Sequence, residues 1–408
     1  MNKPAITEGI GFINYSWPDL GIRVLAERYT DDGYAELWFY SSANGTGDSL
    51  LHTTRVNLLA TTTMSSVAKR LEKNLQDAPW TAILTFITGK TMEVIRRGEP
   101  TEEIWPSKED ELTPKYLLEP ILYLNHPTVI FGEYGSIKSL AALVVAYVVQ
   151  LPYHDNDLGL FTPSESTRCL FLDYEDDTSS FRRRWSALER GFNKGATPIL
   201  YRRMTTTLTD SAGQLQQIIH DKNIGLVIVD SLGPAARGNL NDPEPAIKYH
   251  AALRQMGVTS LTLAHTSKDL LTKRKTIFGS VFFTNLARSV WECKAKQETG
   301  EDEAVISLKH TKANLSRLHP PLGYRFTFTD NSIAVMKIDL KDTGLSGELP
   351  LPWLIKNLLR EEPLTMREIT EMLEKSEDTV KTTLSRMAKN GELVKLPEHK
   401  WGLRASGS

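Results

Sequence analysis

The chain has few of the sequence features that are typical of secreted and membrane proteins. It has only two cysteines, Cys169 and Cys293, in 408 residues, and their separation does not fit a metal-ligand motif. This disfavours disulfide frameworks and zinc ribbons and makes a reducing cytoplasm the expected location. The longest apolar run, LAALVVAYVV, is shorter than a bilayer span, and the first residues lack the apolar core of a signal peptide. We therefore expect no membrane insertion and no secretion.

Charge of either sign is also not in excess. Lysine and arginine number 48 against 50 aspartate and glutamate residues, a net charge of −2. Any attraction to nucleic acid must then come from local patches. An apolar content of 40% and a charged content of 24% are typical of a globular protein. Because 408 residues exceed one ordinary domain, two or three domains are expected.

The first segment, residues 1–112, predicts an N-terminal α+β domain. RVLAERYTDDGYAELWFYSS is typical of a hairpin turned at Asp-Asp-Gly, and helical stretches follow it. The domain carries no chemistry that can be named. It could cap the rest, mediate subunit contact, or bind single-stranded DNA through Trp38 and Phe39, although core packing is the commoner use of such aromatics. The polar stretch GEPTEEIWPSKEDELTP, residues 98–114, is typical of a linker.

The second segment, residues 113–342, alternates short apolar runs with helical patterns. PTVIF, RCLFLDY, ILYRR, LVIVD and SLTLAH are continuous apolar strands, as expected of a parallel sheet covered on both faces. Helical stretches separate them, so the fold class is α/β. Four later runs, ARSVWECKA, AVISLKHTK, YRFTFT and SIAVMKI, predict antiparallel strands that extend this sheet.

The third segment, residues 346–408, has the order helix, helix, helix, β-hairpin. LPWLIKNLLR is the first helix, and TMREITEMLEK is the second, with Thr365 and Glu368 at capping-box spacing. SEDTVKTTLSRMAKN is the third, and Gly391 ends it. This order predicts a winged helix-turn-helix domain.

The stretch FGEYGSIKS, residues 131–139, nearly matches the phosphate-binding pattern G-x-x-x-x-G-K-[ST]. Ile137 stands where the pattern has its second glycine. Because the stretch joins a strand to a helix, backbone N–H groups and the helix N-terminus would attract phosphate there. Lys138 would reach the β- and γ-phosphates, and Ser139 would hold Mg²⁺. The expected nucleotide-binding residues are Gly132, Glu133, Tyr134, Gly135, Ser136, Ile137, Lys138 and Ser139.

Three further residues at strand ends fit a nucleotide site. Asp230 ends LVIVD and is suited to binding both nucleotide and the magnesium shell, although it could simply cap a turn. Glu175 follows RCLFLDY and could activate a water molecule, although three neighbouring acids could also form a solvated loop. His265 ends SLTLAH, at the edge where open α/β sheets bind ligands, and it could equally be a bystander.

FLDYE, LVIVDSL and AHTSK, in that order after a phosphate loop, resemble the RecA-type ATPase core, and most closely its RepA-like hexameric helicase branch. The resemblance implies that Glu175 is the catalytic base, that Asp230 is the Walker B acid and that His265 senses the γ-phosphate. LKHTKANLSR lies where relatives place basic fingers that reach the neighbouring subunit's nucleotide. Lys312 fits that role, whereas Asn314 departs from the second basic position, with Arg317 a possible substitute.

The isoleucine at position 137 leads to a prediction about the backbone conformation of the loop. A β-branched residue does not sit comfortably at positive φ. A phosphate-binding loop should therefore hold Ile137 at negative φ with its side chain turned away from the nucleotide. Gly132, at the tight turn, and Gly135, where the backbone approaches phosphate, would be the glycines that matter. Positive φ at Ile137 would contradict this expectation.

The third helix of the last segment would be a recognition helix, with Val380, Leu384 and Met387 facing the core. From residue 381 onward, six basic residues face two acids, a local charge of +4 that suits phosphate contacts. Winged helices also dock proteins, and the acids of the preceding helix weaken the case for DNA. The candidate DNA-binding residues are Lys381, Thr382, Ser385, Arg386, Lys389 and Lys400.

The sequence therefore favours an ATPase that uses ATP and Mg²⁺ and acts on DNA, as a homo-oligomeric hexamer or filament without membrane contact. Single-stranded DNA would bind the ATPase core, and duplex DNA the winged helix. The favoured activity is a RepA-like replicative DNA helicase of a mobile element. One alternative is a non-unwinding DNA-dependent ATPase, either a recombinase-like filament protein or a helicase loader. The other is a DNA-binding regulator with a nucleotide-sensing or inactive core.

Overall fold

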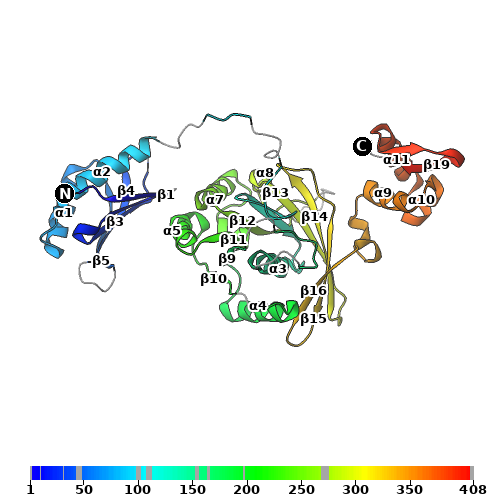
Figure 1. Ribbon diagram of the computed structural model, residues 1–408, viewed down its shortest axis with the longest axis horizontal. Helices are drawn as coiled ribbons and strands as arrows, with labels where there is room; N and C mark the ends of the chain where they lie inside the picture. The colour runs from blue at the N-terminus through cyan, green and yellow to red at the C-terminus, as the bar shows by residue number, and fades with distance from the viewer. Residues whose placement is uncertain are drawn as a thin grey trace. The chain divides into compact units, whose positions relative to one another are not determined.

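The computed structural model describes most of the chain, in ten ranges (Figure 1). These are residues 2–9, 11–30, 32–42, 48–97, 103–106, 113–151, 156–162, 166–195, 198–267 and 275–404. The chain divides into two compact units, each described by itself. The first holds Met1–Thr113, Thr206–Ile224 and Lys248–Val258, and the second holds Pro114–Thr205, Gly225–Ile247 and Thr259–Ser408. Of the expected linker, only residues 103–106, 113 and 114 are among the described residues.

The first unit begins with a five-stranded antiparallel sheet in chain order. Its strands are β1 (Ala5–Gly9), β2 (Phe12–Trp17), β3 (Ile22–Glu27), β4 (Tyr34–Ser41) and β5 (Ser49–Asn57), followed by helices α1 (Thr61–Asn74) and α2 (Trp80–Arg97). The expected hairpin is confirmed, since β3 pairs antiparallel with β4. Inward side chains of the sheet pack with both helices in one apolar core. Phe39 is fully buried in that core, so it cannot stack on a DNA base, whereas Trp38 points to the other face and is half-buried.

The second unit is built on a nine-stranded sheet of order β10-β9-β11-β12-β8-β13-β14-β15-β16. The strands expected to be parallel are β8 (Pro127–Gly132), β9 (Arg168–Asp173), β10 (Leu200–Arg203), β11 (Ile224–Asp230) and β12 (Thr259–His265). The remaining strands are β13 (Ser289–Lys296), β14 (Glu303–Ala313), β15 (Leu322–Phe328) and β16 (Ile333–Ile338). A hairpin of β6 (Tyr116–Leu118) and β7 (Leu122–Tyr123) precedes them. The prediction of an α/β class is confirmed.

One strand differs from its expected direction. β13 was expected to be antiparallel, but it pairs parallel with β8 and antiparallel only with β14, whereas β14, β15 and β16 are antiparallel to all their neighbours. The chain between β12 and β13 includes α8 (Val281–Leu286) and returns to the same end of the sheet before β13 begins, which is the connection that a parallel pair needs. The expectation was wrong because an apolar run in the sequence does not indicate whether the strand will be parallel or antiparallel to its neighbour.

Helix α3 (Lys138–Gln150) fills the core of this sheet. Its residues from Leu140 to Gln150 are all buried, as expected for a helix that is apolar on every side. It packs with the sheet and with α4 (Thr178–Phe192), whose N-cap Asp177 accepts hydrogen bonds from the backbone N–H groups of Ser179 and Ser180. Helix α6 (Leu232–Ala236) also belongs to the second unit, whereas α5 (Leu208–Asp221) belongs to the first and α7 (Pro243–Met256) has residues in both. Across the described ranges, no helix is both long and apolar enough to cross a membrane.

The C-terminal elements follow the expected order. They are α9 (Leu351–Glu361), α10 (Met366–Leu373), α11 (Glu377–Lys389) and a small sheet of β17 (Leu364–Thr365), β19 (Lys400–Leu403) and β18 (Leu393–Lys395). The capping box of Thr365 and Glu368 is present in both directions. Val380, Leu384 and Met387 are buried, as the core spacing predicts. Strand β17 was not predicted, because a strand of two residues shows no recognisable sequence pattern.

Candidate nucleotide-binding site

The loop of residues 133–137 joins β8 directly to α3, the placement that a phosphate-binding loop requires. Gly132 is needed for close packing, because a Cβ there would lie 2.3 Å from the Cys293 carbonyl oxygen and 2.7 Å from Ser136 Oγ. Gly135 takes a φ of +76°, in the region that favours glycine. The loop backbone therefore uses both glycines, one for space and one for its dihedral angle.

Ile137 contradicts the conformational prediction made for it. Its φ is 60° and its ψ is 23°, the left-handed region, where a β-branched residue is a rare outlier. The glycine of the general pattern marks a position that needs positive φ, and the loop keeps that conformation with isoleucine in place. The other half of the prediction agrees with the structure: Ile137 packs its side chain against the core around α3. That packing explains how the strained conformation persists.

Lys138 lies inside the loop. Its Nζ donates hydrogen bonds to the carbonyl oxygens of Gly132 (3.1 Å) and Glu133 (2.7 Å) and to Ser136 Oγ (3.1 Å). The residue is only 8% exposed, and burial lowers the pKa of its ammonium group. The buried ammonium group therefore lies within the loop, and its role toward phosphates stays a prediction.

The order of the strands brings the other candidates to the same edge. β12 lies between β8 and β11, and β9 is the next neighbour of β11. Because β11, β12 and β8 are parallel, Asp230 and His265 emerge at the same end as the loop. His265 is the register partner of Gly132. The structure therefore gathers Lys138, Asp230, Glu175 and His265 from four segments that are far apart in the sequence.

Glu175 is held at the centre of this edge, with about half of its side chain exposed. The hydroxyl of Ser231 donates a hydrogen bond to its Oε1, and His265 Nε2 lies 3.7 Å from the same oxygen. A carboxylate that is oriented from two sides and open to water can accept a proton from a water molecule. Ser231 was not among the sequence candidates, although it directly follows Asp230.

Asp230 is nearly buried, with 7% exposure, and this burial raises the pKa of its carboxyl group to about 6. The neighbouring carboxylates of Glu175 and Asp173 raise the pKa further, while a hydrogen bond with the Ser139 side chain opposes the shift. Close negative charges that destabilise one another are the setting in which a divalent cation binds well. Asp230 and Ser139 therefore fit the magnesium role. No group of three or more His, Cys, Asp or Glu side chains in the described ranges forms a complete metal cage.

Asp173 is a positioning residue that the sequence reasoning missed. It ends β9, is 1% exposed, and its Oδ1 accepts hydrogen bonds from the backbone N–H groups of Glu175 and Asp176, both at 2.9 Å. These bonds fix the turn that presents Glu175. Asp176 instead pairs with Arg184 at 2.8 Å. An aspartate at a strand end followed by a turn is the one signal that could have identified Asp173.

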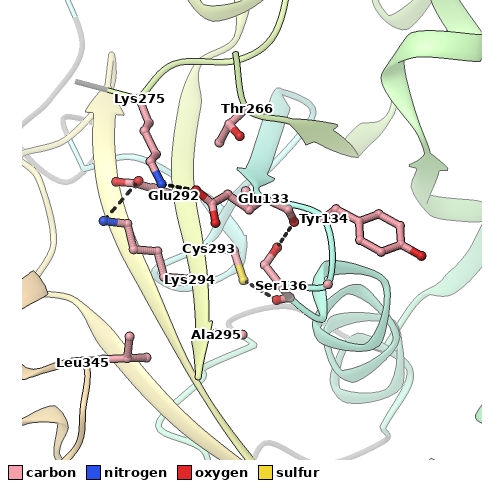
Figure 2. A pocket seen from close by; sticks show the side chains of 12 residues that line it. Glu133, Tyr134, Ser136, Thr266, Lys275, Glu292, Cys293, Lys294, Ala295 and Leu345 are labelled. Carbon is pink, nitrogen blue, oxygen red and sulfur yellow. Dashed lines mark hydrogen bonds and ion pairs between the residues drawn. The ribbon is translucent and has the colours of Figure 1, made fainter. Parts of the chain in front are cut away.

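A cavity of about 300 Å³ lies on the opposite side of the loop, against β13 (Figure 2). Glu133, Gly135 and Ser136 line one wall and Glu292 to Ala295 the other. Lys275 pairs with Glu133, and Lys294 lies 3.5 Å from Glu292. The ring of Tyr134 points away from the ion pairs in this view and is 94% exposed. The loop thus lies between β12, which carries His265, and this polar cavity against β13.

Lys312 is bound within its own chain. Its Nζ donates to the carbonyl oxygens of Thr284, Asn285 and Ala287, at the C-terminal end of α8, at 2.9, 2.8 and 2.5 Å. A cation at a helix C-terminus is a common stabilising arrangement. A finger role in a neighbouring site would require Lys312 to leave these carbonyls, while Arg317 is exposed nearby. The finger role of Lys312 stays a prediction.

The candidate DNA-binding residues lie outside this site, on α11 and β19. Val380, Leu384 and Met387 face the core, and the opposite side of α11 is exposed. Lys381, Thr382, Ser385, Arg386 and Lys389 are exposed, and Lys400 is half-buried. The helix therefore presents its basic and hydroxyl side chains together, which a contact with phosphates requires.

Comparison with known proteins agrees with the geometry of the loop. Residues 99–270 match the family model described as AAA domain, which covers the loop, Glu175, Asp230 and His265. The match supports a P-loop ATPase core in this segment. No curated protein sequence matches the chain.

Solved structures similar to the chain include a KaiC-like protein from the hyperthermophilic archaeon Pyrococcus horikoshii OT3. It shares 18% identity, and the match covers 55% of this chain and 95% of that chain with a TM-score of 0.38. At that TM-score the likeness carries no argument about the fold. The ATPase assignment rests on the family match and on the residues of the site.

Proposed function

We propose that the protein binds and hydrolyses ATP with Mg²⁺ in a RecA-type core and couples hydrolysis to DNA, as a RepA-like replicative helicase does. The observation that carries the proposal is the meeting of Lys138, Asp230 and Glu175 at one sheet edge around the loop. Each of the three contributes a different part of phosphoryl transfer chemistry: a cation for the phosphates, an acid for the metal shell and a carboxylate for water.

Each residue of the site would have a distinct role in ATP hydrolysis. The loop N–H groups and Lys138 would hold the phosphates, and Asp230 with Ser139 would hold a magnesium ion, which supplies charge neutralisation when bound. Glu175, oriented by Ser231 and His265, would orient a water molecule and take its proton. Because the terminal phosphate must face Glu175, the nucleoside would extend to the other side of the loop. The cavity between Glu133 and β13 lies on that side.

Hydrolysis is tested with two variants that separate binding from chemistry. Lys138→Ala should lose both nucleotide binding and turnover. Glu175→Gln should keep nucleotide affinity and lose turnover by about two orders of magnitude or more, because the base is removed without disturbing the phosphates. Glu371→Gln is the matched control, since its carboxylate pairs with Arg367 of α10 and hydrolysis should persist. Unchanged turnover in Glu175→Gln would contradict the assignment.

DNA contact through a winged helix is supported by the exposed basic face of α11. The triple variant Lys381→Ala, Arg386→Ala, Lys389→Ala should weaken duplex binding. It should also reduce the slope of log K against log salt by about 0.9 for each phosphate that a side chain no longer neutralises. Arg367→Ala, an exposed residue of α10 that pairs with Glu371, is the control. Fluorescence anisotropy with duplex and single-stranded oligonucleotides gives both quantities. An unchanged salt dependence would assign this domain to protein contacts.

Activity on DNA distinguishes the remaining alternatives. Hydrolysis stimulated by DNA excludes a regulator with an inactive core. Strand displacement on a forked substrate supports the helicase, whereas DNA-stimulated hydrolysis without displacement supports a filament protein or a loader. We also propose a homo-oligomer, because a RecA-type site takes residues from a neighbouring subunit.

A further inference from the structure

Residues 339–349, which we call the strap, connect β16 to α9. The strap consists of short turns that its own hydrogen bonds close. The Thr343 hydroxyl donates to the Leu340 carbonyl oxygen at 2.8 Å and accepts from the Leu345 N–H at 3.2 Å. The strap is therefore a preformed unit rather than an extended spacer.

Leu345 brings the strap to the cavity beside the phosphate-binding loop. Its side chain lines that cavity together with Gly135 and Ser136 of the loop and Ala295 of β13 (Figure 2). Leu345 is the largest aliphatic side chain in the lining. Because the nucleoside of a bound nucleotide would extend into this cavity, it would meet the strap at Leu345.

Leu345 also belongs to a small apolar cluster that is separate from the core of the nine-stranded sheet. The buried members of this strap cluster are Leu340, Leu345, Leu349 and Leu354, the last of them on α9. Leu340 packs closely on β15, since a Cβ at Gly323 would lie 2.8 Å from its Cγ. One side chain, that of Leu345, is therefore part of both the cavity wall and the strap cluster.

Leu373 of α10 continues these contacts into the C-terminal domain, residues 351–404. It packs against the strap cluster and also against the separate core of that domain, which includes Leu384 of α11. α11 carries most of the candidate DNA-binding residues. Contiguous apolar contacts therefore lead from the nucleotide cavity to the helix proposed to bind duplex DNA, and packed side chains of this kind can couple two sites.

The strap also has space beside it. A groove of about 420 Å³ lies between the strap and the helices α9 and α10. Its lining includes Lys341, Ser346 and Gly347 of the strap and Leu358 and Met372 of the two helices. Because this groove is open, the strap can shift toward the helices without a clash, and coupling requires an element that has more than one arrangement.

We infer that the strap couples the nucleotide cavity to the C-terminal domain, so that a bound nucleotide raises the affinity of that domain for duplex DNA. A nucleoside against Leu345 restrains the strap and, through the strap cluster, the C-terminal helices. Duplex DNA then binds a domain that is already ordered, which lowers the entropic cost of binding. The inference rests on the proposed function and adds its regulation. Linkage requires that duplex DNA raise the nucleotide affinity by the same factor.

Hydrogen exchange followed by mass spectrometry tests the restraint without DNA. Adenylyl imidodiphosphate, a non-hydrolysable ATP analogue, should with Mg²⁺ slow exchange in the loop, in the strap and in α10. Leu349→Ala removes packing between the strap and α9 at a position outside the cavity lining. In this variant the loop should stay protected while α10 exchanges as in the free protein. Leu349→Met keeps the side-chain volume and should behave as the parent.

The pattern of protection separates a failure of the inference from a failure of the proposed function. Absence of protection in the loop would contradict the nucleotide site and this inference with it. Protection of the loop with unchanged exchange in the strap and α10 would contradict the inference alone. Protection of α10 that persists in Leu349→Ala would also overturn it, because the effect would then bypass the strap.

Fluorescence anisotropy on the full chain measures the coupling factor itself. The Kd for a duplex oligonucleotide should fall about fivefold or more when the analogue is added, and the Kd for the analogue should fall by the same factor when the duplex is added. Leu349→Ala should bring this factor to about one. Leu50→Ala, which changes an exposed leucine of β5, is the control and should leave the factor unchanged. Because the factor is a ratio within one preparation, a misfolded fraction does not alter it.

Mass photometry of the same samples distinguishes coupling within the chain from an effect of assembly. A rise in duplex affinity that follows the oligomer mass and is equally large in Leu349→Ala would overturn the inference. A factor of one in the parent would overturn it as well. Absence of duplex binding under all conditions would contradict the winged-helix proposal together with this inference.

Discussion

At the scale of single residues, Ile137 is the most informative position. Its left-handed conformation is unfavourable for any residue with a Cβ, and most unfavourable for a β-branched one. The loop accepts this strain because the side chain is anchored in the core around α3. Residue type thus predicted the wrong dihedral angle here, while the motif that the residue interrupts predicted the right one.

Two substitutions at Ile137 test this strain. Both Ile137→Gly and Ile137→Ala remove the packing of the side chain, but only glycine adopts positive φ without backbone strain. Ile137→Gly should therefore be more stable than Ile137→Ala by about 1 kcal/mol, measured by chemical denaturation. At a helix-interior position with negative φ the order would be reversed, because alanine has the higher helix propensity. ATP affinity of Ile137→Gly should equal that of the parent, because the loop conformation is the same.

Asp230 predicts a pH dependence of stability. Its pKa is raised to about 6, so the folded state holds a proton that the unfolded state releases near pH 4. Stability from this group is complete below about pH 4 and is lost as the pH rises through about 6. Asp230→Asn should then raise the free energy of unfolding by about 1–3 kcal/mol above pH 6, with no gain below pH 4.

Calorimetry across this pH range measures the effect, and the same variant should not hydrolyse ATP. A variant that is less stable than the parent at neutral pH would show that the carboxylate is stabilised by a partner. The expected gain in stability with loss of function is typical of charged groups gathered for ligand binding.

Residue-level reasoning named most of the side chains that meet at this sheet edge, and there is a physical reason for it. Lys138, Asp230, Glu175 and His265 all end or follow strands, and parallel strands place such residues at one edge. Asp173 and Ser231 were missed because their part is to orient a neighbour, and that depends on side-chain geometry which composition does not encode. Lys312 differs from these residues, because it was predicted to reach a neighbouring subunit but binds three carbonyl oxygens of its own chain. Its position in the sequence gave no indication of these bonds.

At the scale of elements, the close packing of α4 on β16 depends on one glycine. A Cβ at Gly191 would lie 1.9 Å from the Ile333 carbonyl oxygen, a clash with backbone. Gly89, on the exposed side of α2, has no atom within 4 Å of the same position.

These two helical glycines give opposite expectations for the same substitution. Gly89→Ala should stabilise the protein by about 0.5–1 kcal/mol through helix propensity. Gly191→Ala should destabilise it by about 1–3 kcal/mol, because α4 must move away from β16. Thermal unfolding of both variants compares them directly, and a stabilised Gly191→Ala would show that the packing there is loose.

Element types and order were predictable, and strand direction was less so. Continuous apolar strands separated by amphipathic helices gave β8 to β12 their parallel order. β13 has the same composition as its antiparallel neighbours, so its parallel pairing with β8 depends on where the preceding connection ends. Short strands such as β17 gain stability only from their partners and have no pattern of their own.

At the scale of the whole molecule, the proposed homo-oligomer predicts that ATP hydrolysis depends on protein concentration, because each site would take residues from a neighbouring subunit. We expect turnover per chain to rise with protein concentration and to reach a plateau as oligomers form. ATP hydrolysis measured over a dilution series, in parallel with mass photometry, tests this. Turnover per chain that stays constant while the mass falls to that of a monomer would show that one chain contains the complete site.

Lys138 has a consequence for how quickly a nucleotide can be accepted. Its ammonium group donates to three acceptors within the loop, so contacts of the chain itself hold the loop in shape. Binding then exchanges one set of hydrogen bonds for another and orders little additional backbone, so the entropic penalty of association is small. Capture of the nucleotide should be limited by diffusion and by the release of that one side chain, rather than by folding of the loop.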